Sequence, residues 1–310
     1  MLSDVGRTLV LGEAVVDLVS EVHSPREPRE SVFRPYRGGT AVNVAVGAHR
    51  IGARVSLMTA AGADIWGDWL RSGIMAEGIS GEFFQLVPGG LTPVSVVTVD
   101  SDGEATIAMY GDDMRRLFVD LDSVLPKALA DVDALFFTSN TLTGPVEREL
   151  TFSALQHATS RHALVIFDAN LRLARWSDSA DAVASCMSVL DRVSVLKCNL
   201  EDARILSGGS TAEAAAHALT DKGPEFVIVT LGAEGAYMRG AMGQAAHFPA
   251  NPALPRCTLG AGDAVSASLI AHLGDGRAGW EAISAGVREG MVLGSRAIEE
   301  WGAFAPQAGG

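Results

Sequence analysis

Cysteine is scarce in this chain: there are three among 310 residues, and their spacing matches no metal site. Cys186, Cys198 and Cys257 are widely separated and odd in number, which is typical of a protein kept in a reducing cytosol. No apolar run reaches the roughly 18 residues that a membrane-spanning helix needs. The first residues also lack a basic stretch followed by an apolar one, which argues against a signal peptide. We therefore expect a cytoplasmic protein.

Positive charge is also in short supply. Lysine and arginine number 24 against 37 aspartates and glutamates, which gives a formal net charge of −13. Nucleic acids and anionic membranes bind basic patches, so neither is an expected partner. The charge does not exclude ATP, because backbone dipoles can bind phosphates within an acidic protein. With 48% hydrophobic and 20% charged residues, the chain is expected to be folded and globular.

What the sequence does contain is a regular alternation of strand-type and helix-type segments. Strands are predicted at residues 8–11, 55–61, 134–138, 163–168 and 195–198, and the helices that follow them at residues 39–52, 65–77, 145–160, 178–190 and 200–207. This spacing predicts a doubly wound α/β fold, with a mostly parallel central sheet and helices on both faces.

One region interrupts the alternation. Residues 92–99 and 104–110 are β-rich runs joined by Asp100-Ser101-Asp102-Gly103, a typical hairpin turn. Residues 13–22 are also β-prone and lead into a polar loop with two prolines. We interpret these stretches as a small β-sheet outside the main one, although an edge extension of the main sheet is the alternative.

Such a small sheet, formed by residues 13–38 and 92–111, could close as a lid over a ligand and exclude water. A chain of 310 residues could hold one large core with an appendage or two domains. No long linker, internal repeat or low-complexity segment divides it, so we expect one domain over residues 1–310 with the lid inserted in it.

A tight glycine turn near the C-terminus carries the most specific chemical signal. Gly260-Ala261-Gly262-Asp263 leads directly into an apolar helix-type segment. Glycines let the backbone approach a ligand, and the free N–H groups of a first helical turn attract anions. A carboxylate beside a bound phosphate makes sense if it takes a proton from a hydroxyl that attacks that phosphate. The segment therefore indicates phosphoryl transfer to an alcohol; the alternative is that Asp263 caps a core helix.

Two other phosphate-binding classes are disfavoured. The chain has no Gly-x-x-x-x-Gly-Lys-Ser/Thr motif, so it is not a P-loop enzyme. A dinucleotide fingerprint should follow a buried first strand, but the glycine turn follows Asn251-Pro252-Ala253-Leu254-Pro255. A nicotinamide-dependent dehydrogenase is therefore not expected.

Five segments together resemble the ribokinase-like (PfkB) family of sugar kinases, in the family's order and over nearly the whole chain. Besides the glycine turn they are Gly38-Gly39-Thr40-Ala41-Val42-Asn43, Asp168-Ala169-Asn170-Leu171-Arg172, Asn199-Leu200-Glu201-Asp202 and Thr230-Leu231-Gly232-Ala233-Glu234-Gly235. Each is weak alone, but each stands at a strand end or turn where an α/β protein places its ligand site.

The resemblance implies a role for each of these residues. Asp263 would be the general base, and the N–H groups of Gly260, Ala261, Gly262 and Asp263 would stabilise the phosphoryl oxygens. Sugar binding is implied for Asp17, Gly38, Gly39, Asn43 and Arg172. Asp17 could instead be a polar residue on an exposed strand face, and Asn43 a residue favoured at a helix start. Arg172 could hold a substrate carboxylate or phosphate, or form a structural ion pair with Asp168.

The nucleotide side is implied by the other two segments. Asn199, Thr230, Gly232 and Gly235 would bind the nucleotide together with Gly260 and Gly262, and Asp202 would hold Mg²⁺ through water. Alternatively, Asn199 caps a helix and the glycines form a plain strand-to-hairpin turn.

Three positions and one segment bear on how closely the chain follows the family pattern. Cys257 stands where the family usually has Asp in a monovalent-cation site, and a neutral thiol is a poor ligand for a hard cation. Potassium activation is therefore in doubt, although backbone carbonyls could supply most of such a site. Asp202 replaces the usual Glu and Ala169 the usual Pro, whereas residues 302–306 resemble the family's closing Gly-Ala-x-x-Pro element.

The resemblance thus implies a sugar kinase that uses ATP and Mg²⁺. Fructose is the first-choice substrate, from the glycine-pair and Asp-x-Asn-x-Arg segments together. The alternative is 2-keto-3-deoxygluconate, whose carboxylate would suit Arg172, but Asp112 and Asp113 follow the hairpin and Arg115 and Arg116 come only later. Ribose and nucleosides are less favoured, and the intact glycine turn argues against a non-catalytic sugar-binding regulator. Relatives often dimerise through the lid, so a homodimer is one expectation.

Overall fold

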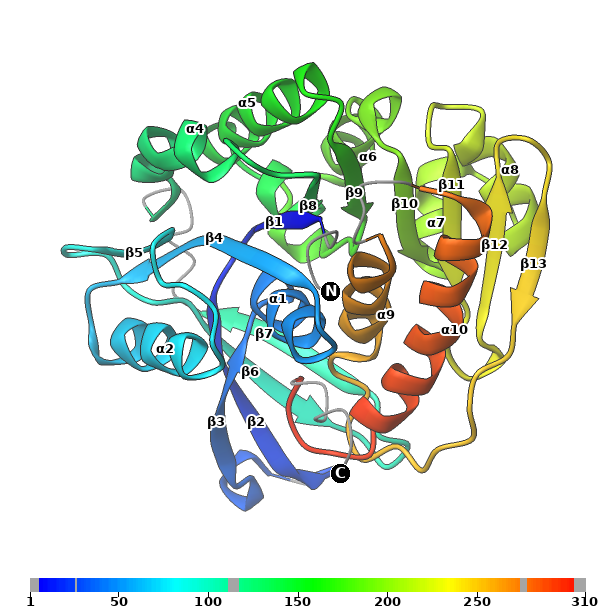
Figure 1. The fold of residues 1–310 in the computed structure, drawn as a ribbon. Helices are drawn as coiled ribbons and strands as arrows, with labels where there is room; N and C mark the ends of the chain where they lie inside the picture. The colour runs from blue at the N-terminus through cyan, green and yellow to red at the C-terminus, as the bar shows by residue number, and fades with distance from the viewer. Residues whose placement is uncertain (1–5, 26, 111–116, 274–277, 304–310) are drawn as a thin grey trace.

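The central sheet contains nine strands in the part of the chain that the computed structural model describes, which is residues 6–25, 27–110, 117–273 and 278–303. Their order is β13-β12-β11-β10-β9-β8-β1-β4-β5 (Figure 1). They are β1 (Arg7–Leu11), β4 (Arg54–Gly62), β5 (Phe84–Val87), β8 (Ala134–Thr138), β9 (Leu164–Asp168), β10 (Val195–Asn199), β11 (Phe226–Thr230), β12 (Ala236–Gly240) and β13 (Ala245–Phe248). Every neighbouring pair from β11 to β5 in this order is parallel. Strands β12 and β13 close the sheet as an antiparallel hairpin beside β11.

Helices cover both faces of this sheet, as expected for a doubly wound fold. One face packs against α1 (Thr40–Arg50), α2 (Ile65–Ala76), α9 (Ala261–His272) and α10 (Trp280–Ala297). The other packs against α4 (Leu125–Ala128), α5 (Pro145–Ser160), α6 (Ser179–Met187), α7 (Leu200–Ser207) and α8 (Ala212–Thr220). Alternate residues of β1 serve the two cores: Val10 belongs to the first, and Leu9 and Leu11 belong to the second.

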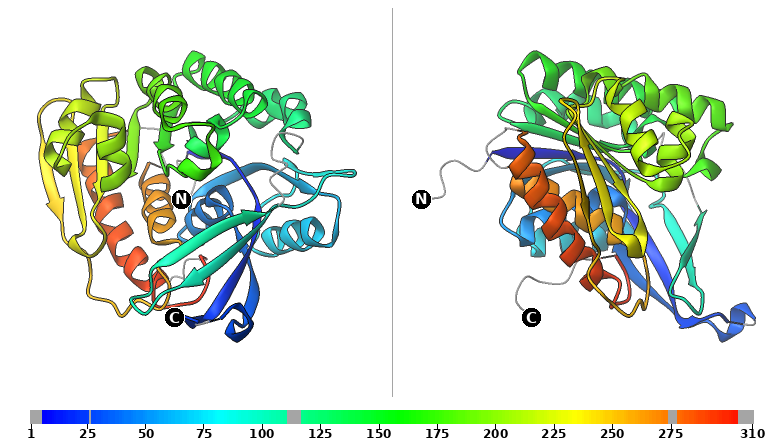
Figure 2. Two further views of the ribbon diagram at one scale, coloured as in Figure 1. Left: turned by 180° about the vertical axis from the view of Figure 1, so that it is seen from behind. Right: turned by 90° about the vertical axis from the view of Figure 1, so that its right-hand side faces the viewer.

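A second sheet, here called the small sheet, has the order β3-β2-β6-β7 and projects from the main body (Figure 2). Its strands are β2 (Val15–His23), β3 (Phe33–Gly38), β6 (Val94–Val99) and β7 (Ala105–Tyr110). It is a separate sheet, so the alternative of an edge extension is wrong. The polar loop expected after residue 22 connects β2 to β3, whereas β3 itself, which includes Pro35, was not predicted as a strand. An edge strand tolerates proline because one side of it needs no backbone donor. Residue 111 lies outside the described residues.

The parallel strands end at one edge of the central sheet, and most of the predicted site residues follow them there. Asp168 ends β9, Asn199 ends β10 and Thr230 ends β11. Helices α1 and α9, which pack side by side under the same edge, bring Asn43 and Asp263 to it (Figure 1). No helix among the described residues has both the length and the apolar character needed to cross a membrane.

Candidate active site

The glycine turn has the geometry of an anion-binding site. Gly260 precedes α9 with φ 86°, and a Cβ built there would lie 2.6 Å from the carbonyl oxygen of Ala303, so only glycine fits. The N–H groups of Gly262 and Asp263 donate to no acceptor among the described residues, and that of Ala261 has only a long contact of 3.4 Å to the Thr258 carbonyl. These unpaired donors at the positive end of a helix favour a bound anion.

Asp263 lies in the first turn of α9 and is held by α1. Its Oδ2 accepts a hydrogen bond of 2.7 Å from the Asn43 side chain. Burial raises the pKa of Asp263 to about 6, although the Asn43 hydrogen bond and the Lys197 ammonium oppose the shift. Asn43 is itself buried and follows the helix start at Gly39 by four residues, so it does not cap the helix. The Asn43 Oδ1 is a buried acceptor without a hydrogen-bond partner in the described part of the chain.

Asp17 faces the interior, so the alternative of an exposed strand position is wrong. It lies on β2 with 6% of its surface exposed, and it accepts a hydrogen bond from the Ser95 hydroxyl on β6. A Cβ at Gly38 would collide with the Asp17 carboxylate, and one at Gly39, where φ is 94°, would collide with the backbone of Glu13. The glycine pair is therefore required for the chain to pass this close to the carboxylate.

Burial raises the pKa of Asp17 to about 7, and the carboxylates of Asp263 and Glu13 add to the shift, while Ser95 and Arg172 oppose it. The folded state therefore prefers the neutral acid, and the stability from this preference is lost as the pH rises from about 4 to above 7. We expect Asp17→Asn to raise the free energy of unfolding at pH 8 by roughly a few kcal/mol. Toward pH 4 this gain should vanish.

Urea unfolding of Asp17→Asn and wild type between pH 4 and 8 measures this difference. Asp102→Asn, at an exposed position of the hairpin turn, is the matched control and should change stability little at either pH. If the free energy of unfolding rises by the same amount at pH 4 and pH 8 in Asp17→Asn, the effect does not come from ionisation of the buried Asp17 carboxylate.

A buried ion pair that sequence reasoning missed lies behind the glycine turn. Lys197 on β10 stands opposite Asp168 on β9, and its Nζ is 2.9 Å from Asp168 Oδ2. Ser266 of α9 donates to the same oxygen at 2.8 Å. A Cβ built on Gly262 would lie 2.9 Å from the Lys197 Nζ, so the ammonium approaches the turn where that residue has no side chain. Burial disfavours the charged form, but the Asp168 carboxylate holds the pKa of Lys197 above its ordinary value.

Arg172 is exposed and stands where the segment after β9 enters a 3₁₀ turn. Among the described residues it forms no ion pair, and Asp168 pairs with Lys197 instead, so the alternative of an Arg172–Asp168 pair is wrong. Its positive charge lowers the pKa of Asp17 and of Asp263, each as a smaller effect than burial. The Arg172 guanidinium therefore favours the ionised form of both carboxylates.

The segments predicted for the nucleotide side also form regular local structure. The Asn199 side chain caps α7 by accepting from the Asp202 N–H at 2.8 Å, so the capping interpretation holds whatever else the residue binds. Asp202 is buried, which raises its pKa to about 6, and its Oδ2 accepts from the Leu171 N–H at 3.2 Å, which opposes the shift. Gly232 and Gly235 have φ of 58° and 100° in the turn between β11 and β12.

Thr230 ends the strand before this turn, and its hydroxyl donates to the Cys198 carbonyl at 3.4 Å. A Cβ on Gly232 would meet nothing within 4 Å, whereas one on Gly235 would collide with the Phe248 carbonyl. Gly235 is thus required by the hairpin, and Gly232 leaves open space beside the sheet edge.

Glu13 and Asn140 form a second polar cluster that sequence reasoning missed. They follow β1 and β8, which are neighbours in the sheet. Glu13 Oε1 accepts from the Asn140 side chain and from the Thr40 N–H, both at 3.1 Å. The other side-chain oxygen of each is buried without a partner. Their position directly after strand-type segments was the only signal in the sequence.

Cys257 is buried, and burial raises the pKa of its thiol, although the amides of Leu259 and Gly302 oppose the shift. The thiol is therefore neutral near pH 7. Of the residues at 302–306, Gly302 and Ala303 are described and the rest lie outside the described residues, as do Asp112, Asp113, Arg115 and Arg116.

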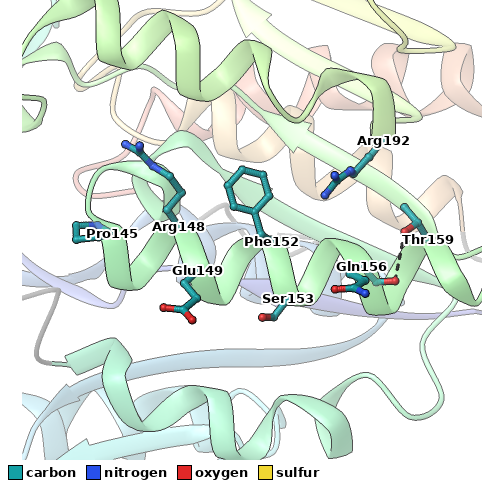
Figure 3. A pocket seen from close by; sticks show the side chains of 8 residues that line it. All are labelled: Pro145, Arg148, Glu149, Phe152, Ser153, Gln156, Thr159 and Arg192. Carbon is teal, nitrogen blue, oxygen red and sulfur yellow. Dashed lines mark hydrogen bonds between the residues drawn. The ribbon is translucent and has the colours of Figure 1, made fainter.

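A hollow beside α5 is lined by residues other than these groups. Its lining residues on α5 are Pro145, Arg148, Glu149, Phe152, Ser153, Gln156 and Thr159, and Arg192 joins them from the 3₁₀ turn Leu190–Arg192 (Figure 3). None of the predicted site residues lines it.

Comparison with known proteins is consistent with this arrangement. The profile of the pfkB family carbohydrate kinases matches residues 6–296. A fructokinase of Klebsiella pneumoniae is 30% identical over 86% of this chain and 84% of its own length. A fructokinase of Salmonella typhimurium is 31% identical over 85% of this chain and 83% of its own length.

Among solved structures, a fructokinase double mutant from Vibrio cholerae O395, bound to fructose, ADP and potassium, superposes with a TM-score of 0.85. It is 25% identical in sequence, and the match covers 97% of this chain and 95% of the other. The similarity extends over the central sheet and the small sheet alike.

Proposed function

Because the chain belongs to the pfkB family of carbohydrate kinases and is a sugar kinase, we propose that it transfers the γ-phosphate of MgATP to fructose. The observation that carries this proposal is the placement of Asp263. Its carboxylate is held by Asn43 at 2.7 Å and stands among the unpaired N–H groups of the glycine turn. A base and an anion site are thus combined at one helix start.

In the proposed reaction, Asp263 takes the proton of the attacking sugar hydroxyl. The hydroxyl oxygen bonds to the γ-phosphorus, and the bond between the γ-phosphorus and the β-phosphate oxygen breaks to release ADP. A pKa of about 6 leaves the carboxylate ionised at pH 7 yet basic enough to accept that proton. The N–H groups of Gly260–Asp263 would donate hydrogen bonds to the equatorial phosphoryl oxygens. The Lys197 ammonium adds positive charge behind the same turn.

The residues present fit Mg²⁺ bound mostly through phosphates and water. Asp202 is the carboxylate that we assign to the ion, through water, and the oxygen of Asn199 is already used in the helix cap, which leaves its NH₂ to donate to a phosphate. Among the described residues no cluster of three or more His, Cys, Asp or Glu could hold a metal. Mg²⁺ characteristically keeps several waters and uses few protein ligands, and it would neutralise charge on the phosphates.

Asp17 would bind two sugar hydroxyls, with Asn43 and the backbone of Gly38 and Gly39 completing the contacts. Burial makes this recognition selective, because a missing hydroxyl would leave a buried carboxylate unpaired. The small sheet, formed within residues 13–38 and 92–111, would act as the lid, and two copies would associate through it as a homodimer. Fructose is favoured because the relatives compared above include two fructokinases and a structure bound to fructose.

One observation favours a second substrate. Arg172 is exposed and has no ion-pair partner among the described residues, so it could bind the carboxylate of 2-keto-3-deoxygluconate bidentately. Fructose offers Arg172 no such group.

A coupled assay of ADP release distinguishes these proposals. We expect kcat/KM for fructose to exceed that for 2-keto-3-deoxygluconate, ribose and fructose 6-phosphate by at least about 100-fold, because a site that hydrogen-bonds substrate hydroxyls rejects analogues that leave its buried groups unpaired. Potassium should stimulate little, because Cys257 offers a neutral thiol. Greater activity on 2-keto-3-deoxygluconate would make the acid the substrate, and no turnover of any sugar despite sugar binding would indicate a non-catalytic regulator.

A further inference from the structure

The hairpin turn of the small sheet is hydrogen-bonded to the segment that leads into the glycine turn. The Thr258 N–H donates to the Gly103 carbonyl at 2.8 Å. The Thr258 hydroxyl accepts from the Ala105 N–H at 3.2 Å and donates to Glu104 Oε2 at 3.1 Å. Thr258 thus joins the turn between β6 and β7, although it stands more than 150 positions further along the chain.

Close packing reinforces these hydrogen bonds. Gly103 has φ 84°, and a Cβ built there would lie 2.9 Å from both the Cβ and the carbonyl oxygen of Pro255. His23 ends β2 beside the same hairpin turn, because it pairs with Val99 of β6. Its ring nitrogen Nε2 is 2.8 Å from the Arg256 carbonyl, and its ring centroid is 5.0 Å from that of Trp301. The segment 255–258 therefore runs across the hairpin end of the small sheet.

The inner face of the small sheet also packs against the segments on both sides of Gly260. Its buried valines, Val19, Val97 and Val99, form one apolar cluster with Cys257, and Leu259 and Trp301 pack against that cluster. The Trp301 segment continues to Ala303, whose carbonyl closes over Gly260. The glycine turn is thus fixed to the small sheet from two directions.

The same sheet carries the carboxylate proposed to bind sugar. Asp17 is on β2 and is hydrogen-bonded to Ser95 on β6, the strand that ends at the hairpin turn. A displacement of β2 and β6 on sugar binding would therefore reach the glycine turn through Thr258. We propose that Thr258 is a positioning residue that couples occupancy of the sugar site to the placement of the phosphate-binding N–H groups. This inference rests on the sugar kinase function proposed above.

Thr258→Val tests the coupling, because it keeps the shape and the backbone hydrogen bond and removes both hydrogen bonds of the hydroxyl. We expect kcat to fall about tenfold, since small misplacements of reacting groups are costly, while KM for the sugar changes less than about threefold. In the wild type, calorimetry should show that fructose tightens ADP binding and that ADP tightens fructose binding, because such coupling is reciprocal. Both effects should be lost in Thr258→Val.

Three further variants separate coupling from a general structural effect. Thr258→Ser keeps the hydroxyl and should restore kcat and the coupling to near wild-type values. Glu104→Ala removes only one exposed hydrogen-bond partner of the Thr258 hydroxyl, so it should lower kcat and the coupling less than Thr258→Val does. It also gives a test should Thr258→Val fold poorly. Thr106→Val, at an exposed position of β7, is the matched control and should leave both unchanged.

Unchanged kcat and coupling in Thr258→Val would overturn the inference, as would a failure of Thr258→Ser to restore them. Either result leaves the proposed function intact, because wild-type turnover of sugars is measured independently. Absence of turnover by the wild-type protein on every sugar would instead contradict the function itself.

Discussion

Asp263→Asn should bind fructose and ATP with near wild-type affinity and lose turnover by about 10²–10⁴-fold, the range that a positioned general base contributes. The amide oxygen of the new side chain can still accept the 2.7 Å hydrogen bond from Asn43, so α1 and α9 should remain packed as they are. What is lost is the ability to take a proton. The expected change is therefore confined to kcat.

Single-turnover measurements with fructose and ATP, together with calorimetry of each ligand, separate chemistry from binding. Asp221→Asn, at an exposed helix end, is the control and should be indistinguishable from wild type. In the wild-type protein, kcat should fall as the pH drops through about 6, because protonation of Asp263 removes the base. An Asp263→Asn variant that retains a tenth or more of wild-type turnover would contradict the proposed mechanism.

The elements predicted best from the sequence are those whose ends are marked by local chemistry. The predicted bounds of α5 and α7 match the structure because Pro145 begins the first, while the Asn199 side chain caps the second and Gly208 ends it with φ 74°. Five strands of the central sheet, β1, β4, β8, β9 and β10, were predicted from apolar runs, and the other four were not. β3 was missed because Arg34, Pro35 and Arg37 have no strand-type pattern, and its pairing with β2 is set by the rest of the small sheet.

The same distinction applies to the site. Asp263 could be proposed from the glycine turn and the helix start that it follows, and Asp17 and Asn43 from the resemblance to the sugar kinase family. The structure brings Asn43 and Asp263 into contact. The Asp168–Lys197 pair could not, because it depends on the register of β9 against β10. A lysine within an otherwise apolar strand was the one signal available. Buried lysines are rare unless paired, so that residue called for a partner that the sequence did not identify.

Lys197→Met should be the most destabilising single change at this site. Among the described residues it leaves the fully buried Asp168 with the Ser266 hydroxyl as its one remaining side-chain hydrogen-bond donor, and breaking a buried ion pair in this way costs about 3–5 kcal/mol. The double variant Asp168→Asn/Lys197→Met removes both charges, and Ser266 can still donate to the new amide oxygen. We therefore expect the double variant to recover most of the lost free energy of unfolding.

Catalysis should not recover with stability, because the two effects have different causes. The Lys197 ammonium lies 2.9 Å from where a Cβ of Gly262 would be, so it adds positive charge at the turn that receives the transferred phosphoryl group. We expect kcat of the double variant to remain at least about tenfold below wild type, since removing one preorganised electrostatic contact typically costs 10²–10³ and this one acts from behind the backbone. Urea unfolding and kcat measured on both variants test this. Wild-type turnover in the double variant would mean that Lys197 serves only to neutralise Asp168, and that the N–H groups of the turn stabilise the phosphoryl group without it.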